Sequence, residues 1–198
     1  MTSLLLTALR TLLVMTLLTG LVYPLATTLL ANLLFADEAA GSLIERDGQT
    51  VGSHLIGQPF SGDRYFWGRP SATGTMPYNA AASSGANVGP TNPALGERLQ
   101  ASVEGIRAAH PSQKGPVPVD LVTMSASGLD PHLSPAAASY QIDRVAAARA
   151  MSTDTVRDFV TKATEPRQLG FLGEARVNVL ELNLALDALS GATKEPAQ

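Results

Sequence analysis

The segment TLLVMTLLTGLVYPLATTLLANLLFA, Thr11 to Ala36, contains no charged residue. At about 1.5 Å of rise per helical residue it would extend over roughly 39 Å, more than the roughly 30 Å hydrocarbon core of a bilayer. A soluble core helix is rarely apolar all round over such a length. The segment therefore predicts a transmembrane anchor. The alternative is a cleaved signal peptide, whose apolar region is usually only about 7–15 residues long.

The residues that flank this segment differ in charge. Arg10 precedes it, and Asp37, Glu38 and Glu45 follow it. Because positively charged flanks are retained in the cytoplasm, we expect the N-terminus inside and the rest of the chain outside the membrane. The flanks thus predict a single-pass protein with an extracytoplasmic domain.

A proline within the segment should bend the helix. Pro24 removes one backbone donor and clashes with the preceding turn, and Gly20 lies one turn earlier. In a membrane such a defect is tolerated best where a neighbouring helix covers it, and small or hydroxyl-bearing residues such as Thr16 and Thr27 suit close helix contact. Gly20 and Pro24 therefore fit either a contact with partner helices or an ordinary anchor.

Length and composition limit what the rest of the chain can be. The 198 residues divide into a short cytoplasmic N-terminus (1–10), the anchor (11–36), a soluble domain (37–190) and a loose tail (191–198). The formal net charge of −3, without a basic stripe, argues against a nucleic acid partner. The absence of cysteine excludes disulfides and thiolate metal sites.

The sequence lacks the usual motifs of nucleotide and metal chemistry. It contains no P-loop, no GxGxxG and no GxSxG. The three histidines, His54, His110 and His132, do not have metal-ligand spacing, and the predicted span has no ionisable residue to line an ion path. We therefore expect no catalytic residue and no bound metal in this chain, and no ion transport by this chain alone.

The soluble part has the pattern of a mixed α/β (α+β) domain. Turn and cap signals predict a hairpin around Asp47-Gly48, a strand at 117–124, and helices from Pro93 to about His110, from Ser134 to about Ala150 and after a cap at Thr153. Residues 176–189 have capping-box spacing between Asn178 and Glu181 but also alternating leucines, so they fit either a helix or a strand.

A long segment from Pro59 to Pro93 is rich in Gly, Ser, Asn and Pro, yet it holds half of the chain's aromatic residues. Disordered segments are usually poor in aromatics, so we expect this loop to be ordered. The rings either fold back onto the core or anchor a partner protein. The candidate anchors are Phe60, Tyr65, Phe66 and Trp67.

The densest polar cluster lies in VTMSASGLDPHLSP, Val122 to Pro135, and its candidate residues are Ser125, Ser127, Gly128, Asp130 and His132. Serine, histidine and aspartate are the components of a nucleophilic triad. They are also what a tight loop needs: Gly128 permits a positive φ, and Asp130 before a proline favours a turn. We weigh three interpretations, a structural loop, a binding loop and a hydrolytic site, and favour the structural loop.

Several stretches together resemble the C subunit of Kdp-type potassium-transporting ATPases, the KdpC family. The stretches are GSLIERDGQTVGSHLIGQPF (41–60), DRYFWGRPSAT (63–73), SSGANVGPTNP (83–93), PVDLVTMSASGLDPHLSPAAASYQIDRVAAAR (118–149) and GEARVNVLELNLALD (173–187). With the N-terminal anchor they cover most of the chain, and the run from Pro118 to Arg149 is highly specific.

The resemblance implies a subunit of an ATP-driven potassium uptake pump in the bacterial inner membrane. Its partners would be a channel-like potassium-binding subunit, a P-type ATPase catalytic subunit and often a very small fourth subunit, which together handle ATP and potassium. The chain would be a non-catalytic assembly subunit that caps the channel-like subunit. The family is also described as binding nucleotide, whereas the predicted topology and the missing P-loop argue against direct ATP binding.

Two other functions remain open from the sequence. One is a membrane-anchored extracytoplasmic hydrolase that uses Ser125 or Ser127 with His132. The other is a free-standing binding or adhesion domain. Co-purification with large polytopic membrane proteins separates the pump subunit from both.

Overall fold

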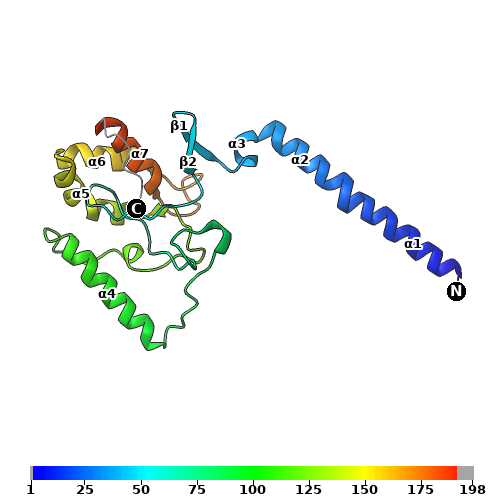
Figure 1. The fold of residues 1–198 in the computed structure, drawn as a ribbon, viewed down its shortest axis with the longest axis horizontal. Coiled ribbons are helices and arrows are strands. Elements are labelled where there is room, and N and C mark those ends of the chain that lie inside the picture. The colour runs from blue at the N-terminus through cyan, green and yellow to red at the C-terminus, as the bar shows by residue number, and fades with distance from the viewer. Residues whose placement is uncertain (1, 191–198) are drawn as a thin grey trace. The chain divides into compact units, whose positions relative to one another are not determined.

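The apolar N-terminal segment forms one long helix, Thr2–Leu34 (Figure 1). The structure, a computed structural model, describes residues 2–190. The helix consists of α1 (Thr2–Leu17), a π-helical turn (Leu18–Val22) and α2 (Tyr23–Leu34), and no residue in it is buried. It is long and apolar enough to cross a bilayer. It begins before the predicted anchor, because residues 2–10 are helical as well.

The π-helical turn includes Gly20 and ends at Val22, two residues before Pro24. Pro24 has no amide hydrogen to offer the carbonyl one turn earlier, and a wider turn is one way in which a helix accommodates that defect. Thr27 Oγ1 donates to the carbonyl oxygens of Tyr23 and Pro24, both at 3.0 Å. The bend expected at Gly20 and Pro24, and a contact of this part with a partner helix, stay predictions.

A short helix, α3 (Ala36–Ala39), and a hairpin follow the long helix. The hairpin consists of β1 (Leu43–Arg46) and β2 (Gln49–Ser53). Asp47 and Gly48 connect them with φ values of +53° and +73°, the positive values that a two-residue hairpin turn requires. The predicted hairpin is confirmed. The chain divides into two compact units after Val51.

The core of the second unit consists of helices packed on a small sheet, and Figure 1 shows three of these helices, α5, α6 and α7, close together. The helices are α5 (Pro135–Arg149), α6 (Thr153–Lys162) and α7 (Val179–Ser190). The antiparallel sheet has the order β3 (His132–Leu133), β5 (Arg176–Asn178), β4 (Thr164–Glu165). Among the fully buried side chains are Val145, Val156, Val177 and Leu186. The predicted mixture of helix and strand is confirmed.

Side-chain caps fix where the helices begin. Ser134 Oγ accepts from the Ala137 amide at the start of α5, as predicted, whereas α6 is capped by Ser152 and not by Thr153. Asn178 Oδ1 accepts from the Glu181 amide at 3.2 Å. The alternating leucines at 180–186 therefore lie in a helix, α7, and the strand alternative is wrong for them; the strand β5 ends before them, at Asn178.

Helix α4 (Pro93–Ala109) begins after the Asn92 cap and ends at His110, as predicted. Its residues Leu99, Val103 and Ile106 face the hydrophobic core. Their spacing of three and four residues places them on one face of the helix.

The predicted strand at 117–124 is wrong. Its centre is a 3-10 turn, Val119–Leu121, and Thr123, two residues after this turn, donates from Oγ1 to the Val119 carbonyl at 2.8 Å. Asp120 Oδ2 accepts from the Ser134 amide at 2.6 Å, and Val119 is 67 % exposed. These two side-chain bonds to the backbone, one local and one to a residue 14 positions away, hold the segment in a turn instead of a strand.

Candidate functional site

Two buried carboxamides hold the long loop 54–92 against the helices. Asn183 on α7 accepts from the Phe66 amide at 2.8 Å and donates to the Phe66 carbonyl at 2.9 Å. Gln141 on α5 accepts from the Trp67 amide at 2.9 Å and donates to the Trp67 carbonyl at 3.1 Å. Each side chain satisfies both backbone groups of one loop residue, as a neighbouring strand would. We call these four residues the carboxamide clamp.

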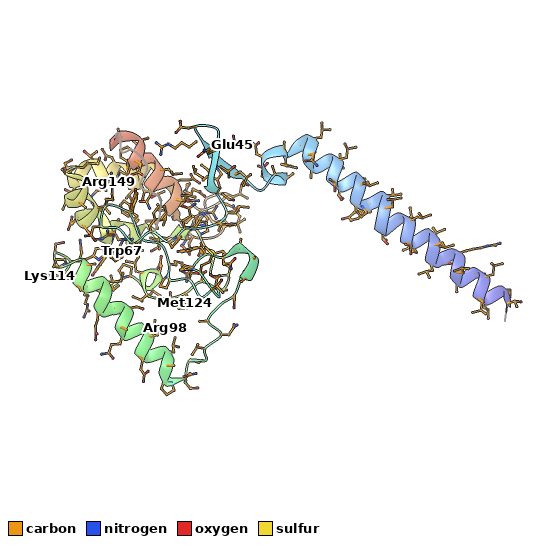
Figure 2. All side chains as sticks on the ribbon, in the orientation of Figure 1. Glu45, Trp67, Arg98, Lys114, Met124 and Arg149 are labelled. Atoms are coloured by element: carbon orange, nitrogen blue, oxygen red, sulfur yellow. The ribbon has the colours of Figure 1, made fainter. Side chains whose placement is uncertain are left out.

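The rings of this loop pack on the domain itself. Phe66 is fully buried in the core, and Phe60 and Trp67 are partly buried against it. Figure 2 shows Trp67 among the side chains of the second unit, and its indole nitrogen donates to the Gly62 carbonyl at 3.0 Å. Tyr65 lies on Phe60, with ring centres 5.2 Å apart. Burial assigns Phe66 to the core, and a role of the other rings as partner anchors stays a prediction.

Arg144 on α5 connects the clamp to its surroundings. Its guanidinium carbon lies 4.1 Å from the centre of the Trp67 ring, a cation–π contact. Its nitrogens donate to the carbonyls of Gly62, Asp63 and Tyr65, to Gln141 Oε1 and to His110 Nε2. Burial lowers the pKa of Arg144 to about 10, so it stays charged at neutral pH.

His110 at the end of α4 is buried and neutral. Its Nε2 accepts from Arg144 Nε at 2.9 Å, which requires that Nδ1 carries the proton and donates to the Ile106 carbonyl at 2.7 Å. The ring also contacts Trp67 edge-on and Tyr140. Burial, helped by the positive charge of Arg144, lowers the pKa of His110. The histidine therefore acts as a hydrogen-bond acceptor in a packed site.

A second cluster joins the same loop to residues 123–132. Arg69 donates to Asp130 Oδ2 at 3.0 Å and to the carbonyls of Thr123 and Met124. Asp130 Oδ1 accepts from the His132 amide at 3.0 Å. Burial alone would raise the pKa of Asp130, but the hydrogen bonds from His132 and then Arg69 outweigh it, and the pKa is lowered. We call Arg69, Asp130 and His132 the Asp130 cluster.

Gly128 lies beside this cluster where two segments cross. Its φ is +67°, as predicted, and a Cβ there would lie 2.7 Å from the Ser84 carbonyl oxygen and 2.8 Å from Thr73 Cγ2. Ser71 Oγ donates to the Gly128 carbonyl at 2.7 Å. Ser125 Oγ accepts from the Gly128 amide at 2.9 Å. Glycine is required here both by the backbone angle and by the space.

The candidate nucleophiles are engaged with the backbone. Ser125 Oγ bonds to the Gly128 amide, and Ser127 Oγ accepts from the Leu129 amide at 3.1 Å. Within residues 2–190 no hydrogen bond joins either serine to His132, whose Nδ1 lies 3.4 Å from Asp130 Oδ1. A triad requires a bond from serine to histidine, so this arrangement supports the structural interpretation. The described residues also contain no group of three or more His, Asp or Glu placed to hold a metal ion.

A cavity of about 450 Å³ lies between the two clusters. Its walls include Phe60, Trp67, Arg69, Tyr78, Ile106 and Leu121. Tyr78 OH donates to the Arg69 carbonyl at 2.6 Å, and burial raises the pKa of Tyr78 to about 12. The other residues of the lining include Gln58 and Ser61 but no His, Asp, Glu or Lys that could act as a base, so the cavity presents no catalytic arrangement.

Comparison with known proteins identifies the family. The family description "KdpC: K+-transporting ATPase, c chain" matches residues 5–188. The chain is 62 % identical over 182 residues to the Potassium-transporting ATPase KdpC subunit of Methylococcus capsulatus. These 182 residues are 92 % of this chain and 96 % of that relative. It is 62 % identical over 176 residues to the KdpC subunit of Polaromonas naphthalenivorans, covering 89 % and 90 %. It is 57 % identical over 182 residues to that of Herpetosiphon aurantiacus, covering 92 % and 94 %.

The chain belongs to the KdpC family. The family match includes the long helix and the domain together. The resemblance inferred from the sequence is thereby confirmed, and with it the assignment to a potassium-transporting ATPase.

The KdpC domain uses polar residues that the sequence reasoning missed. Gln141 and Asn183 are buried on the inner faces of α5 and α7. A carboxamide within the apolar run LELNLAL is a detectable signal, because a buried polar side chain needs a dedicated partner. Nothing in the sequence indicates that the partners are Phe66 and Trp67, which lie more than seventy residues away in the chain.

Proposed function

We propose that this chain is a non-catalytic accessory subunit of an ATP-driven, high-affinity potassium uptake pump. Its helix anchors it in the bacterial inner membrane, and its domain, residues 37–190, caps a channel-like potassium subunit on the extracytoplasmic side. A P-type ATPase subunit and a small fourth subunit complete the complex. The observation that carries the proposal is the family match over residues 5–188, which spans both anchor and domain.

The helix supports the membrane part of the proposal. None of its residues is buried within the described chain, although its side chains are mostly apolar. Such a surface is stable only in lipid or against other apolar helices. Arg10 before the predicted span and Asp37 and Glu38 after it favour a cytoplasmic N-terminus.

The domain supports the non-catalytic part of the proposal. Its buried polar side chains bond to its own backbone: Asn183 to Phe66, Gln141 to Trp67 and Ser125 to Gly128. Groups that are used in this way are not free to act on a substrate. We therefore assign ATP and potassium to the partner subunits and no cofactor to this chain.

Co-purification tests the proposal. The affinity-tagged chain is expressed together with the channel-like and P-type ATPase subunits of its own organism and purified in mild detergent. We expect both partners to be retained in constant ratio to the chain. The chain purified alone should show neither ATP hydrolysis nor potassium flux in liposomes. Recovery of the tagged chain without either partner would contradict the proposal.

Cysteine labelling tests the orientation, because the chain has no native cysteine. Thr2→Cys and Met76→Cys place single thiols at exposed positions in the helix and in the domain. In intact spheroplasts, a membrane-impermeant maleimide should label Met76→Cys, whereas Thr2→Cys should react only after permeabilisation. The reverse pattern would place the domain in the cytoplasm.

A further inference from the structure

A groove of about 650 Å³ lies between helix α4 and two loop segments of the second unit, residues 85–89 and 123–126. Helix α4 contributes Leu95, Arg98 and Leu99, whose spacing of three and four residues places them on one face. Figure 2 shows Arg98 on α4 and Met124 on the facing segment, and both line the groove. It shares no lining residue with the cavity between the two clusters. We call it the Arg98 groove.

The arginine of this groove has no counter-charge. Arg98 is half-buried, and within residues 2–190 it forms neither an ion pair nor a hydrogen bond. Two other arginines that line cavities differ from it, because Arg69 pairs with Asp130 and Arg144 donates to several backbone carbonyls. The lining of the Arg98 groove includes no Asp or Glu. A guanidinium that is partly removed from water is stabilised by an anion, so the charge of the groove favours an anionic ligand.

The loop wall of the groove offers further donors. Within the described part of the chain, the amides of residues 85–89 form no hydrogen bond. The loop is nevertheless held at both ends, because the Ser84 amide donates to the Ser127 carbonyl and the Asn92 amide to the Gly89 carbonyl. Successive free amides bind anions well. They add uncharged donors to the charge of Arg98.

The other walls are aliphatic and indicate what the anionic group is attached to. Val88, Leu95, Leu99 and Met124 are half-buried there. An inorganic anion would leave these side chains uncovered, whereas an attached apolar chain would remove them from water. The lining contains no aromatic residue, so a nucleobase would find no ring to stack on. The walls therefore match an aliphatic chain that carries one anionic group.

We infer that the Arg98 groove binds a single-chain amphiphile with one anionic group. Its carboxylate or phosphate lies against Arg98 and the amides of residues 85–89, and its acyl chain lies along Leu95, Leu99 and Met124. The chain carries a helix long enough to cross a bilayer, so fatty acids and single-chain phospholipids are the amphiphiles within its reach. The inference does not depend on the part that the chain plays in the pump.

Photolabelling of the full-length chain tests the inference. The chain is reconstituted in nanodiscs of phosphatidylcholine and irradiated with decanoate that carries a diazirine on its acyl chain, and adducts are located by peptide mass spectrometry. We expect adducts within residues 85–99 and 123–126. Arg98→Gln should reduce them about tenfold, as expected for the loss of a charged hydrogen bond, relative to adducts on the membrane helix.

The matched control is Arg107→Gln. It removes the same charge from an exposed position in the last turn of α4. Its groove adducts should equal those of the wild type. Wild type without adducts at the groove, or equal labelling of the groove in wild type and Arg98→Gln, would contradict the inference.

Competition with unlabelled compounds identifies the chemistry of the ligand. Decanoate or decyl phosphate should suppress the groove adducts, and the more effective of the two assigns a fatty acid or a single-chain phospholipid. Decanol, which has no charge, and inorganic phosphate, which has no chain, should not. Suppression by either of these, or by the tripeptide Ala-Leu-Leu more strongly than by decanoate, would overturn the inference.

The melting temperature without ligand shows whether Arg98 serves the fold instead. Because Arg98 has no partner within residues 2–190, Arg98→Gln should melt no lower than Arg107→Gln. A lower melting temperature for Arg98→Gln would show that the arginine pairs within the chain, and the groove would then lack the free charge on which the inference rests.

Discussion

The carboxamide clamp and the Asp130 cluster attach the same loop to the same domain by different physical means. The clamp consists of uncharged side chains, and Asn183 and Gln141 are at most 1 % exposed. In the Asp130 cluster, the side chains of Arg69 and Asp130 are charged and 26 % and 27 % exposed. A broken buried bond leaves groups that water cannot reach, whereas a broken half-exposed bond is partly replaced by water. The clamp should therefore contribute more to the free energy of unfolding than the Asp130 cluster does.

The largest effect is expected from Asn183→Ala. It leaves the amide and the carbonyl of Phe66 buried without partners, at about 1–3 kcal/mol for each group, so we expect a loss of roughly 3–5 kcal/mol in the free energy of unfolding. The control, Gln100→Ala, removes an exposed carboxamide that bonds to Glu104, and it should change stability by less than about 0.5 kcal/mol. Equal denaturation midpoints for the two variants would show that the clamp is not essential.

Gly128→Val should have the next largest effect. A β-branched residue at φ of +67° costs about 1–3 kcal/mol, and contact with the Ser84 carbonyl adds to that. Gly48→Val separates the two causes, because Gly48 has φ of +73° and a Cβ added there would meet no atom within 4 Å. We expect chemical denaturation to show a larger loss for Gly128→Val than for Gly48→Val. If the losses are equal, the crossing at Gly128 contributes nothing beyond its backbone angle.

A smaller effect is expected from Asp130→Ala, which removes the acceptor of Arg69 and of the His132 amide. Half-exposed charged bonds contribute about 1 kcal/mol, and salt screens the ionic part. The loss in unfolding free energy should therefore be roughly 1 kcal/mol at low salt and less in about 1 M salt. A loss as large as that of Asn183→Ala, and independent of salt, would make the two regions equivalent.

The two regions should also respond to acid in different pH ranges. Burial lowers the pKa of His110, so the folded chain binds that proton less readily than the unfolded chain, in which the pKa is about 6.5. Stability therefore falls as pH drops below about 6.5. The pKa of Asp130 is also lowered, but its contribution is lost only as pH falls below the unfolded value of about 3.9.

Melting temperatures at pH 7.5 and 5.0 test this difference. The groups around His110 are Arg144, which disfavours its protonation, and Asp63, which favours it. His110→Gln keeps an uncharged acceptor for Arg144 and should reduce the loss of stability between these pH values. Asp130→Asn should leave that loss unchanged. An identical acid response of wild type and His110→Gln would exclude His110 as its source.

The sequence predicted the elements that depend on local signals. The helix starting at Ser134 and the hairpin at Asp47-Gly48 follow from caps and turn residues that lie within a few positions of each other. The strand predicted at 117–124 failed because Asp120 bonds to the Ser134 amide, a contact that no local pattern records.

In the candidate site, too, features set by local sequence were predicted and contacts between distant residues were not. The positive φ of Gly128 was predicted from the turn, whereas the bond from Arg69 to Asp130 joins residues 61 positions apart. His110 was excluded as a metal ligand by its spacing, but its bond to Arg144 could not be foreseen. Long-range polar partners depend on the packed fold, and a single sequence shows only that a polar residue within an apolar run requires one.

Amide hydrogen exchange of the full-length chain tests most directly that the carboxamide clamp makes the loop part of the core. The amides of Phe66 and Trp67 bond to buried Asn183 and Gln141, whereas the Ser84 amide bonds to the Ser127 carbonyl nearer the surface. We predict that Phe66 and Trp67 exchange only through global unfolding, and that Ser84 exchanges faster through local opening. Exchange of Phe66 and Trp67 as fast as that of Ser84 would contradict the account.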